Sequence, residues 1–323
     1  MRTMTYGEGI REGMRIRMME DPNVIIFGED VGQFGGCFGV TAGMYEEFSG
    51  ERVRDTPISE GVIIGAAVGS AATGLKPIAE LMFMDFSTVG MDQLVNQAAK
   101  MRYMFGGKIA LPMVVRLPSG GGVRAAAQHS QSLESWFTHV PGLKVVYPSN
   151  AADAAGMMLT AIDDDNPVIF VEHKAIYAIK GEVPDVIEPI PFGKASVKKE
   201  GTDVTILTYG KQVYDALSAA ETLAKDGIDA EVVDLRSLYP LDKEAISASL
   251  KKTGKIVLVS EEVKRGGYIG EIAAMIAEEF FFDLDAPIQR VGALNTPIPF
   301  SGELEDYVLP NDIDIVNTVK KLF

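Results

Sequence analysis

The chain alternates short apolar runs with longer segments in which apolar residues recur every three or four positions. The short runs are typical of buried parallel strands, and the longer segments of helices with one buried face. In residues 1–175 the predicted strands are 23–27, 76–80, 113–117, 142–147 and 167–172, and the predicted helices are 5–19, 59–73, 91–105 and 153–162. This alternation predicts an α/β fold in which helices cover both faces of a parallel sheet.

A second, smaller α/β unit is predicted beyond residue 195. Residues 180–193 hold three prolines and no clear period, which indicates a linker. The strands predicted after it are 204–209, 229–234, 255–260 and 288–291, and the helices are 213–226, 243–252, 270–280 and 314–322. A length of 323 residues agrees with two domains, at about 150 residues per domain.

Residues 55–86 form the stretch around which the chain is organised, with the pattern loop, helix, turn, strand and loop. Ser59 is expected to cap the helix, and Gly74 to end it. Inside the helix stand Gly61, Gly65 and Gly69, each costing roughly 1 kcal/mol relative to alanine. We therefore expect another backbone or a flat ligand to approach this helix closely.

Two carboxylates flank this helix and the strand after it. Glu60 lies in the first helical turn, among apolar residues, and Glu80 ends the strand 76–80. A carboxylate in apolar surroundings is costly without a partner, so Glu60 is a candidate for proton chemistry. The alternative is a helix-start glutamate that serves only the helix dipole.

The composition argues against nucleic-acid binding and against a membrane protein. The apolar fraction is 47% and the charged fraction 23%, as in an ordinary globular protein. The net charge of −15 and the lack of a basic tract argue against nucleic-acid binding, and no apolar run is long enough for a membrane span. The single Cys37 and the absence of a signal-peptide pattern make the cytoplasm the expected compartment. The glycine-rich loops 32–39 and 118–122 match neither a dinucleotide nor a P-loop motif.

Of the three histidines, His129 is the best candidate for chemistry. It stands in a predicted loop between two glutamines, after a glycine-rich turn, where an imidazole can face a cavity. A structural role is the alternative for His129. His139 precedes Pro-Gly and is expected to be structural, and His173 follows a strand.

Seven of these stretches, in this order and spacing, resemble the β subunit of the thiamine-diphosphate-dependent E1 component of 2-oxo acid dehydrogenase complexes. They are 28–32 (GEDVG), 55–60 (DTPISE), 92–100 (DQLVNQAAK), 127–131 (AQHSQ), 141–146 (PGLKVV), 166–170 (NPVIF) and 231–242. The chain resembles the acetoin dehydrogenase branch most and the pyruvate branch next. The branched-chain branch usually has Gln and Tyr where this chain has Met82 and Phe86, which disfavours that alternative.

The resemblance implies a pyrimidine-binding domain at 1–185, a linker at 186–195 and a transketolase C-terminal domain at 196–323. It implies an α2β2 heterotetramer with thiamine diphosphate at the α–β boundary, and a lipoyl-bearing E2 acyltransferase as the next partner. The chain has no Gly-Asp-Gly with a downstream Asn, the family motif for diphosphate and magnesium. The resemblance therefore implies that the α subunit holds the magnesium and that the β subunit is active only with it.

The resemblance also assigns roles to individual residues. Glu60 matches the glutamate that hydrogen-bonds N1′ of the aminopyrimidine and promotes its imino tautomer. Three apolar residues match positions that contact this ring: Ile58, Met82 and Phe86. Glu29 matches a polar residue behind the site that would link the two cofactor sites of the tetramer; the alternative is a structural role. His129 matches a histidine near the channel for the lipoyl group, where it would donate a proton or hydrogen bond during reductive acyl transfer.

A structural potassium ion is also implied, held largely by main-chain carbonyls. The matching positions are Met113, Ala161, Asp164 and Asn166, and hard cations do prefer oxygen ligands. The alternative is that residues 161–166 form a solvated acidic loop. For the whole chain, the alternatives to a catalytic E1 β subunit are a non-catalytic α/β scaffold subunit and a self-sufficient enzyme of the transketolase type.

Overall fold

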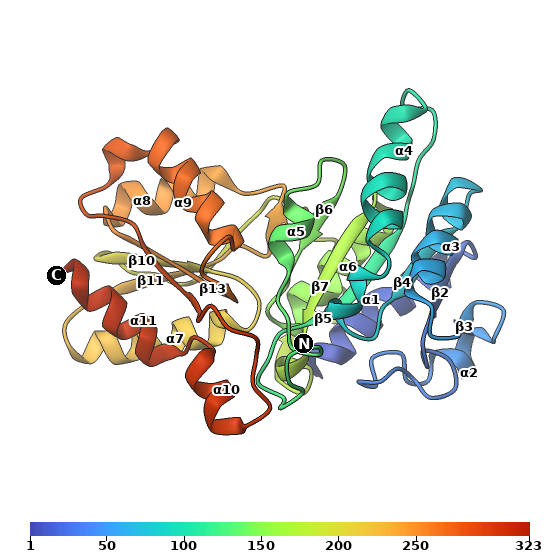
Figure 1. Cartoon of the computed structure of the whole chain (residues 1–323), viewed down its shortest axis with the longest axis horizontal. Coiled ribbons are helices and arrows are strands. Elements are labelled where there is room, and N and C mark those ends of the chain that lie inside the picture. Colours follow the sequence, from blue (N-terminus) through green and yellow to red (C-terminus); the bar gives the residue numbers. More distant parts are fainter. The chain divides into compact units, whose positions relative to one another are not determined.

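The computed structural model describes all 323 residues, which form two compact units. The first unit comprises Met1–Ser119 and Trp136–Phe192, and the second Gly120–Ser135 and Gly193–Phe323. Each has its own sheet and helices (Figure 1). The α/β fold expected from the sequence is confirmed.

The sheet of the first unit is parallel, with its strands in the order β6-β7-β5-β4-β2-β3. The strands are β2 (Val24–Gly28), β3 (Val53–Asp55), β4 (Lys76–Glu80), β5 (Val114–Ser119), β6 (Lys144–Val146) and β7 (Val168–His173). Every residue of β2, β5 and β7 is buried, as expected for strands covered on both faces.

The helices around this sheet are α1 (Tyr6–Glu20), α2 (Met44–Phe48), α3 (Glu60–Ala72), α4 (Ala99–Met104), α5 (Glu134–Thr138) and α6 (Ala151–Asp163), with 3₁₀ turns at Met84–Thr88 and Lys174–Ile176. A capping box of Thr5 and Glu8 starts α1. Helices α1 and α6 approach so closely that a Cβ at Gly13 would lie 2.7 Å from the carbonyl oxygen of Ala155. Glycine is therefore required on this face of α1.

The structure corrects three expectations in this unit. Ser59 occupies the N-cap position of α3, but its side chain makes no capping hydrogen bond. The helix expected at 91–105 contains a π-helical segment, Gln93–Ala98, before α4. The segment 180–193, which its prolines indicated as a linker, contains β8 (Lys180–Val183), and this strand pairs antiparallel with β1 (Arg2–Thr5). These two strands are largely polar and partly exposed, so they lack the apolar pattern by which the other strands were recognised.

The second unit has a sheet in the order β14-β13-β10-β11-β9, parallel except for β9. Its strands are β9 (Ser196–Lys199), β10 (Val204–Thr208), β11 (Ala230–Asp234), β13 (Ile256–Val263) and β14 (Gln289–Ala293), and a short β12 spans Ser237–Tyr239. Its helices are α7 (Gln212–Lys225), α8 (Lys243–Thr253), α9 (Tyr268–Glu279), α10 (Gly302–Val308) and α11 (Asp312–Val319), with 3₁₀ turns at Phe281–Asp283 and Lys320–Leu322.

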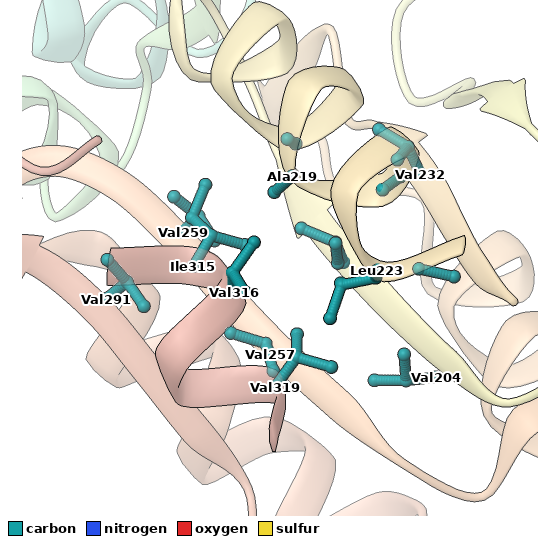
Figure 2. Close-up of a cluster of buried hydrophobic side chains, with 14 residues drawn as sticks. Val204, Ala219, Leu223, Val232, Val257, Val259, Val291, Ile315, Val316 and Val319 are labelled. Atoms are coloured by element: carbon teal, nitrogen blue, oxygen red, sulfur yellow. The ribbon is translucent and has the colours of Figure 1, made fainter. Parts of the chain in front are cut away.

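One face of this second sheet is covered by α7 and α11, and the other by α8 and α9 (Figure 1). The core under α7 and α11 consists of aliphatic side chains from both helices and four strands (Figure 2). Leu223 of α7 and Val319 of α11 are fully buried there, against Val204 and Val257 of the sheet. No helix of the protein combines the length and the apolar character needed to cross a bilayer.

Candidate active site

The candidate site residues of the first unit gather at the carboxyl ends of neighbouring parallel strands. Gly28 at the end of β2 lies opposite both Asp55 of β3 and Glu80 of β4. Glu29 directly follows β2, and Glu60 opens the helix that follows β3. Parallel α/β sheets bind ligands at this edge. Glu29 and Glu60 thus lie at the edge of the sheet where such folds bind ligands.

Glu60 is a buried carboxylate without a hydrogen-bond partner. Its side chain is 7% exposed, and no hydrogen bond or ion pair joins it to another residue of the chain. It is the first residue of α3, where the helix dipole favours a negative charge. Both carboxyl oxygens are therefore open to a hydrogen-bonding group supplied by a ligand.

Glu29 lies close enough to interact electrostatically with Glu60. Its Oε1 atom is buried and has no hydrogen-bond partner. Burial, and then the negative charges of Glu60, Asp30 and Glu80, raise the pKa of Glu29 above its usual value. The site therefore contains a second carboxyl group that holds a proton more readily than an exposed glutamate does.

Glu80 belongs to a fully paired network that the sequence did not reveal. Arg116 of β5 pairs with Glu80 through Nη1 and with Glu172 of β7 through Nε and Nη2, the latter two at 2.6 and 2.8 Å. The Tyr177 hydroxyl donates to Glu172 at 2.6 Å. Burial raises the pKa of Glu80, and the nearby guanidinium opposes that rise. Arg116 is completely buried, so this network of one arginine, two glutamates and one tyrosine lies inside the sheet region beneath the strand ends.

The glycine-rich loop after β2 turns tightly beside Glu80. Gly35 and Gly36 both have φ of +84°, and a Cβ at Gly36 would lie 3.6 Å from Oε1 of Glu80. The Gly32 amide donates to Asp55 at 2.6 Å. These glycines make a tight turn beside the site, which accounts for the composition that matched no nucleotide motif.

The three predicted apolar contacts differ in exposure. Met82 and Phe86 are half-buried, and the Phe86 ring meets Phe83 edge-on with centroids 5.8 Å apart. Ile58 is 81% exposed, so nothing within this chain encloses it. Val62 of α3 is also exposed. This side of the site is open and apolar, as it would be if a ligand or another chain covered it.

His129 belongs to the second unit. It lies half-buried on the loop between β5 and α5, residues 120–133, which packs with the second unit although it precedes the C-terminal segment in sequence. The structure therefore joins Glu29, Glu60, Met82 and Phe86 in one unit and places His129 in the other.

The residues expected to bind potassium lie near the end of α6. The Asp164 carboxylate pairs with Lys144 and accepts from the backbone and side-chain nitrogens of Asn166, both at 2.9 Å. The Met113 carbonyl accepts from the Val168 amide at 2.9 Å. Ala161 lies in the last turn of α6, where helix carbonyls lack intrahelical donors. Main-chain oxygens here suit a cation, whereas the Asp164 carboxylate is already neutralised by Lys144.

Comparison with known proteins decides the family. The profile of the transketolase pyrimidine binding domain matches residues 2–180, and that of the transketolase C-terminal domain matches residues 193–315. The chain is 50% identical to the β subunit of acetoin:2,6-dichlorophenolindophenol oxidoreductase from Bacillus subtilis, over 99% of this chain and 97% of that one. The chain belongs to the E1 β-subunit family of thiamine-diphosphate-dependent 2-oxo acid dehydrogenases.

Other relatives of this E1 β subunit span several substrate branches. It is 48% identical to the 2-oxoisovalerate dehydrogenase β subunit of Bacillus subtilis (100% and 99% coverage) and 46% identical to the pyruvate dehydrogenase E1 β subunit of Rickettsia felis (99% and 98%). A solved structure titled split gene transketolase, inactive β4 tetramer, shares its fold at a TM-score of 0.81 and 24% identity, over 99% of this chain and 98% of that one.

Sequence reasoning about the E1 β subunit missed Arg116, Glu172 and Tyr177. Arg116 lies inside an apolar strand pattern, which is itself a signal: a fully buried arginine needs buried carboxylates. Which carboxylates these are depends on strand order, and strand order is not visible in the sequence.

Proposed function

We propose that this chain, together with an α subunit, forms a thiamine-diphosphate-dependent E1 enzyme that cleaves acetoin or decarboxylates pyruvate and passes the acyl unit to lipoyl-E2. The observation that carries the proposal is Glu60, a buried carboxylate without a partner, at the carboxyl edge of a pyrimidine-binding domain. The identity of 50% to an acetoin-oxidising β subunit supports the acetoin branch.

Glu60 is the residue to which we assign proton chemistry. Thiamine diphosphate, when bound, supplies an electron sink at its thiazolium ring. The Glu60 carboxyl group would share a proton with N1′ of the aminopyrimidine, which carries that proton in the imino tautomer, and N1′ would be the partner that Glu60 lacks within this chain. Glu29 lies behind Glu60, and its raised pKa allows it to hold a proton there at a pH where an exposed glutamate is ionised.

The apolar residues orient the ring. Phe86 would stack on the aminopyrimidine, and Met82 would pack against its edge through a polarisable sulfur. Ile58 closes the other side and becomes buried only in the assembled enzyme, which agrees with its exposure in the single chain.

The α subunit completes the site. We assign to it the magnesium ion and the diphosphate grip, because this chain lacks the sequence motif for them. The assembly we propose is an α2β2 heterotetramer. We assign no nucleic-acid or membrane partner, and we keep the cytoplasm as the compartment.

His129 serves the second half-reaction. It donates a proton or hydrogen bond when the acyl unit passes reductively to the lipoyl group of E2. A potassium ion would be held largely by main-chain carbonyls at Met113, Ala161, Asp164 and Asn166. The Asp164 carboxylate pairs with Lys144, which leaves the main-chain carbonyl of Asp164 as its ligand atom.

The test is co-expression with an α subunit, followed by assays with pyruvate, acetoin and branched-chain 2-oxo acids in the presence of thiamine diphosphate and magnesium. Turnover of acetoin or pyruvate supports the proposal. A preference for branched-chain oxo acids favours the second candidate, a branched-chain E1 β subunit. This candidate is supported by the 48% identity to a 2-oxoisovalerate dehydrogenase β subunit. An assembled complex without any thiamine-dependent turnover favours the scaffold alternative.

A further inference from the structure

The loop that carries His129 has a backbone that its own residues do not favour. Arg124 and Ala126 both have φ of +61°, in the left-handed region that side chains other than glycine rarely adopt. Such conformations cost energy and persist only where the surroundings fix them. The contacts of this loop should therefore show what fixes it.

Glu305 of α10 is the main contact. Its side chain is completely buried, and both its oxygens accept from the loop. Oε1 accepts from the Gly122 amide at 2.8 Å. Oε2 accepts from the Arg124 amide at 3.2 Å and from its guanidinium Nη1 at 2.8 Å. One carboxylate thus binds two loop amides that lie two residues apart.

Two more buried glutamates, at the end of β13, hold the ends of the loop. Glu261 accepts from the Gly121 amide at 2.6 Å, and Glu262 accepts from the Ser135 amide at 2.8 Å. Hydrogen bonds from backbone amides to a buried carboxylate are stronger than bonds between neutral groups. Both ends of the segment 120–135 are therefore held by buried carboxyl groups.

One side of the loop borders a cavity. The cavity has a volume of about 310 Å³ and is lined by loop residues 127 and 130–133, by residues 295–298, and by Glu261, Glu262 and Leu309. At the start of the loop, a Cβ on Gly121 would lie 2.8 Å from the Leu309 side chain. Because packed neighbours do not enclose the loop on the cavity side, its hydrogen bonds to the buried carboxylates contribute to where it places His129.

We propose that Glu305, assisted by Glu261 and Glu262, is a positioning residue for His129 in acyl transfer to the lipoyl group. The inference rests on the function proposed for His129. The proposal gives the C-terminal domain a functional role, because three of its buried carboxyl groups set the conformation of the loop that carries His129.

The test is Glu305→Gln in the reconstituted α–β enzyme. Glutamine keeps the shape of the side chain but offers one acceptor oxygen in place of two, so one of the two loop amides loses its acceptor. The matched control is Asp306→Asn. Asp306 binds the same Arg124 guanidinium, at 2.7 and 2.9 Å, but accepts from no loop amide.

Two rates are measured for each variant: acyl transfer to a lipoyl domain and reduction of an artificial electron acceptor. Glu305→Gln should lower lipoyl transfer by about 10- to 100-fold, the scale of a misplaced catalytic group, and acceptor reduction by less than about threefold. Asp306→Asn should change either rate by no more than about twofold. A general structural defect would lower both rates together, and that result overturns the proposal.

His129→Ala separates this inference from the function on which it rests. If His129→Ala selectively impairs lipoyl transfer but Glu305→Gln does not, the positioning role is refuted and the histidine assignment stands. If His129→Ala lowers both rates equally, the histidine assignment itself fails.

Amide hydrogen exchange of the wild-type enzyme tests the anchors even if Glu305→Gln fails to assemble. The amides of Gly122 and Arg124 should exchange at least about 100-fold more slowly than in an unstructured peptide. Exchange at the unstructured rate would show that Glu305 does not hold the loop.

Discussion

Arg116→Met should be among the most destabilising single changes in this protein. The guanidinium is completely buried and bonded to both Glu80 and Glu172. Methionine fills much of the same volume but leaves two buried carboxylates without their cation. Removing one partner of a buried ion pair costs roughly 3–5 kcal/mol. Because two carboxylates lose the same partner, we expect a value near the upper end.

In thermal unfolding this corresponds to a decrease in Tm of roughly 6–20 °C, at about 2–4 °C per kcal/mol for a domain of this size. The assay is denaturation followed by circular dichroism, with urea titration to give the free energy of unfolding. The control is Arg15→Met. Arg15 pairs with Glu47 at 2.7 Å but both side chains are more than a third exposed, so the loss should be at most about 1 kcal/mol.

The effect of Arg116→Met should depend on pH with a definite sign. Burial already raises the pKa of Glu80, and the arginine opposes that rise. Without the arginine, the folded-state pKa of Glu80 lies further above its unfolded value, so the folded state loses stability as pH rises above about 4.5. The variant should therefore lose more stability at pH 8 than at pH 5. A loss no greater than that of Arg15→Met, at either pH, would refute the buried-network account.

Three further predictions concern other parts of the chain. Gly13→Ala should destabilise the first unit by roughly 1–3 kcal/mol in urea denaturation, since its Cβ would meet the Ala155 carbonyl at 2.7 Å; an unchanged midpoint would contradict the close packing of α1 and α6. Glu134 is fully buried, and burial together with Glu262 and Glu261 raises its pKa well above the usual value. The free energy of unfolding should therefore decrease as pH rises above about 4.5. In a series of Tm values against pH, the Glu134→Gln variant should show a smaller decrease than the wild type. Identical slopes for the two proteins would contradict this role of Glu134. His129→Ala should lower lipoyl transfer by about 10²-fold or more at nearly unchanged acceptor reduction, which comparison of the two assays would show.

The α/β architecture could be predicted because buried parallel strands are continuous apolar runs. β2, β5 and β7 are buried along their whole length, and each coincides with such a run within a residue or two. The strands that were missed, such as β1 and β8, are polar and partly exposed. Their pairing depends on a contact between the two ends of the first unit, which no local pattern records.

The candidate site could be predicted in part. Glu60 stood out as an acid in an apolar helix start, and the structure confirms that it is buried. Arg116, its carboxylates and Tyr177 are brought together only by strand order. The three glutamates around the His129 loop could not be found from sequence, because Glu305 lies more than 180 residues from Gly122 and meets it only in the folded second unit.

The central claim is that the Glu60 carboxylate acts on the aminopyrimidine, and Glu60→Gln in the assembled α–β enzyme tests it most directly. The measurement is kcat with an artificial acceptor at saturating thiamine diphosphate, with Glu46→Gln as control, since Glu46 also lies in a first helical turn but is exposed. The account predicts that Glu60→Gln lowers kcat by roughly 10²–10⁴-fold while Glu46→Gln leaves it unchanged. A Glu60→Gln enzyme with wild-type kcat would contradict the account and leave Glu60 only its role at the start of the helix.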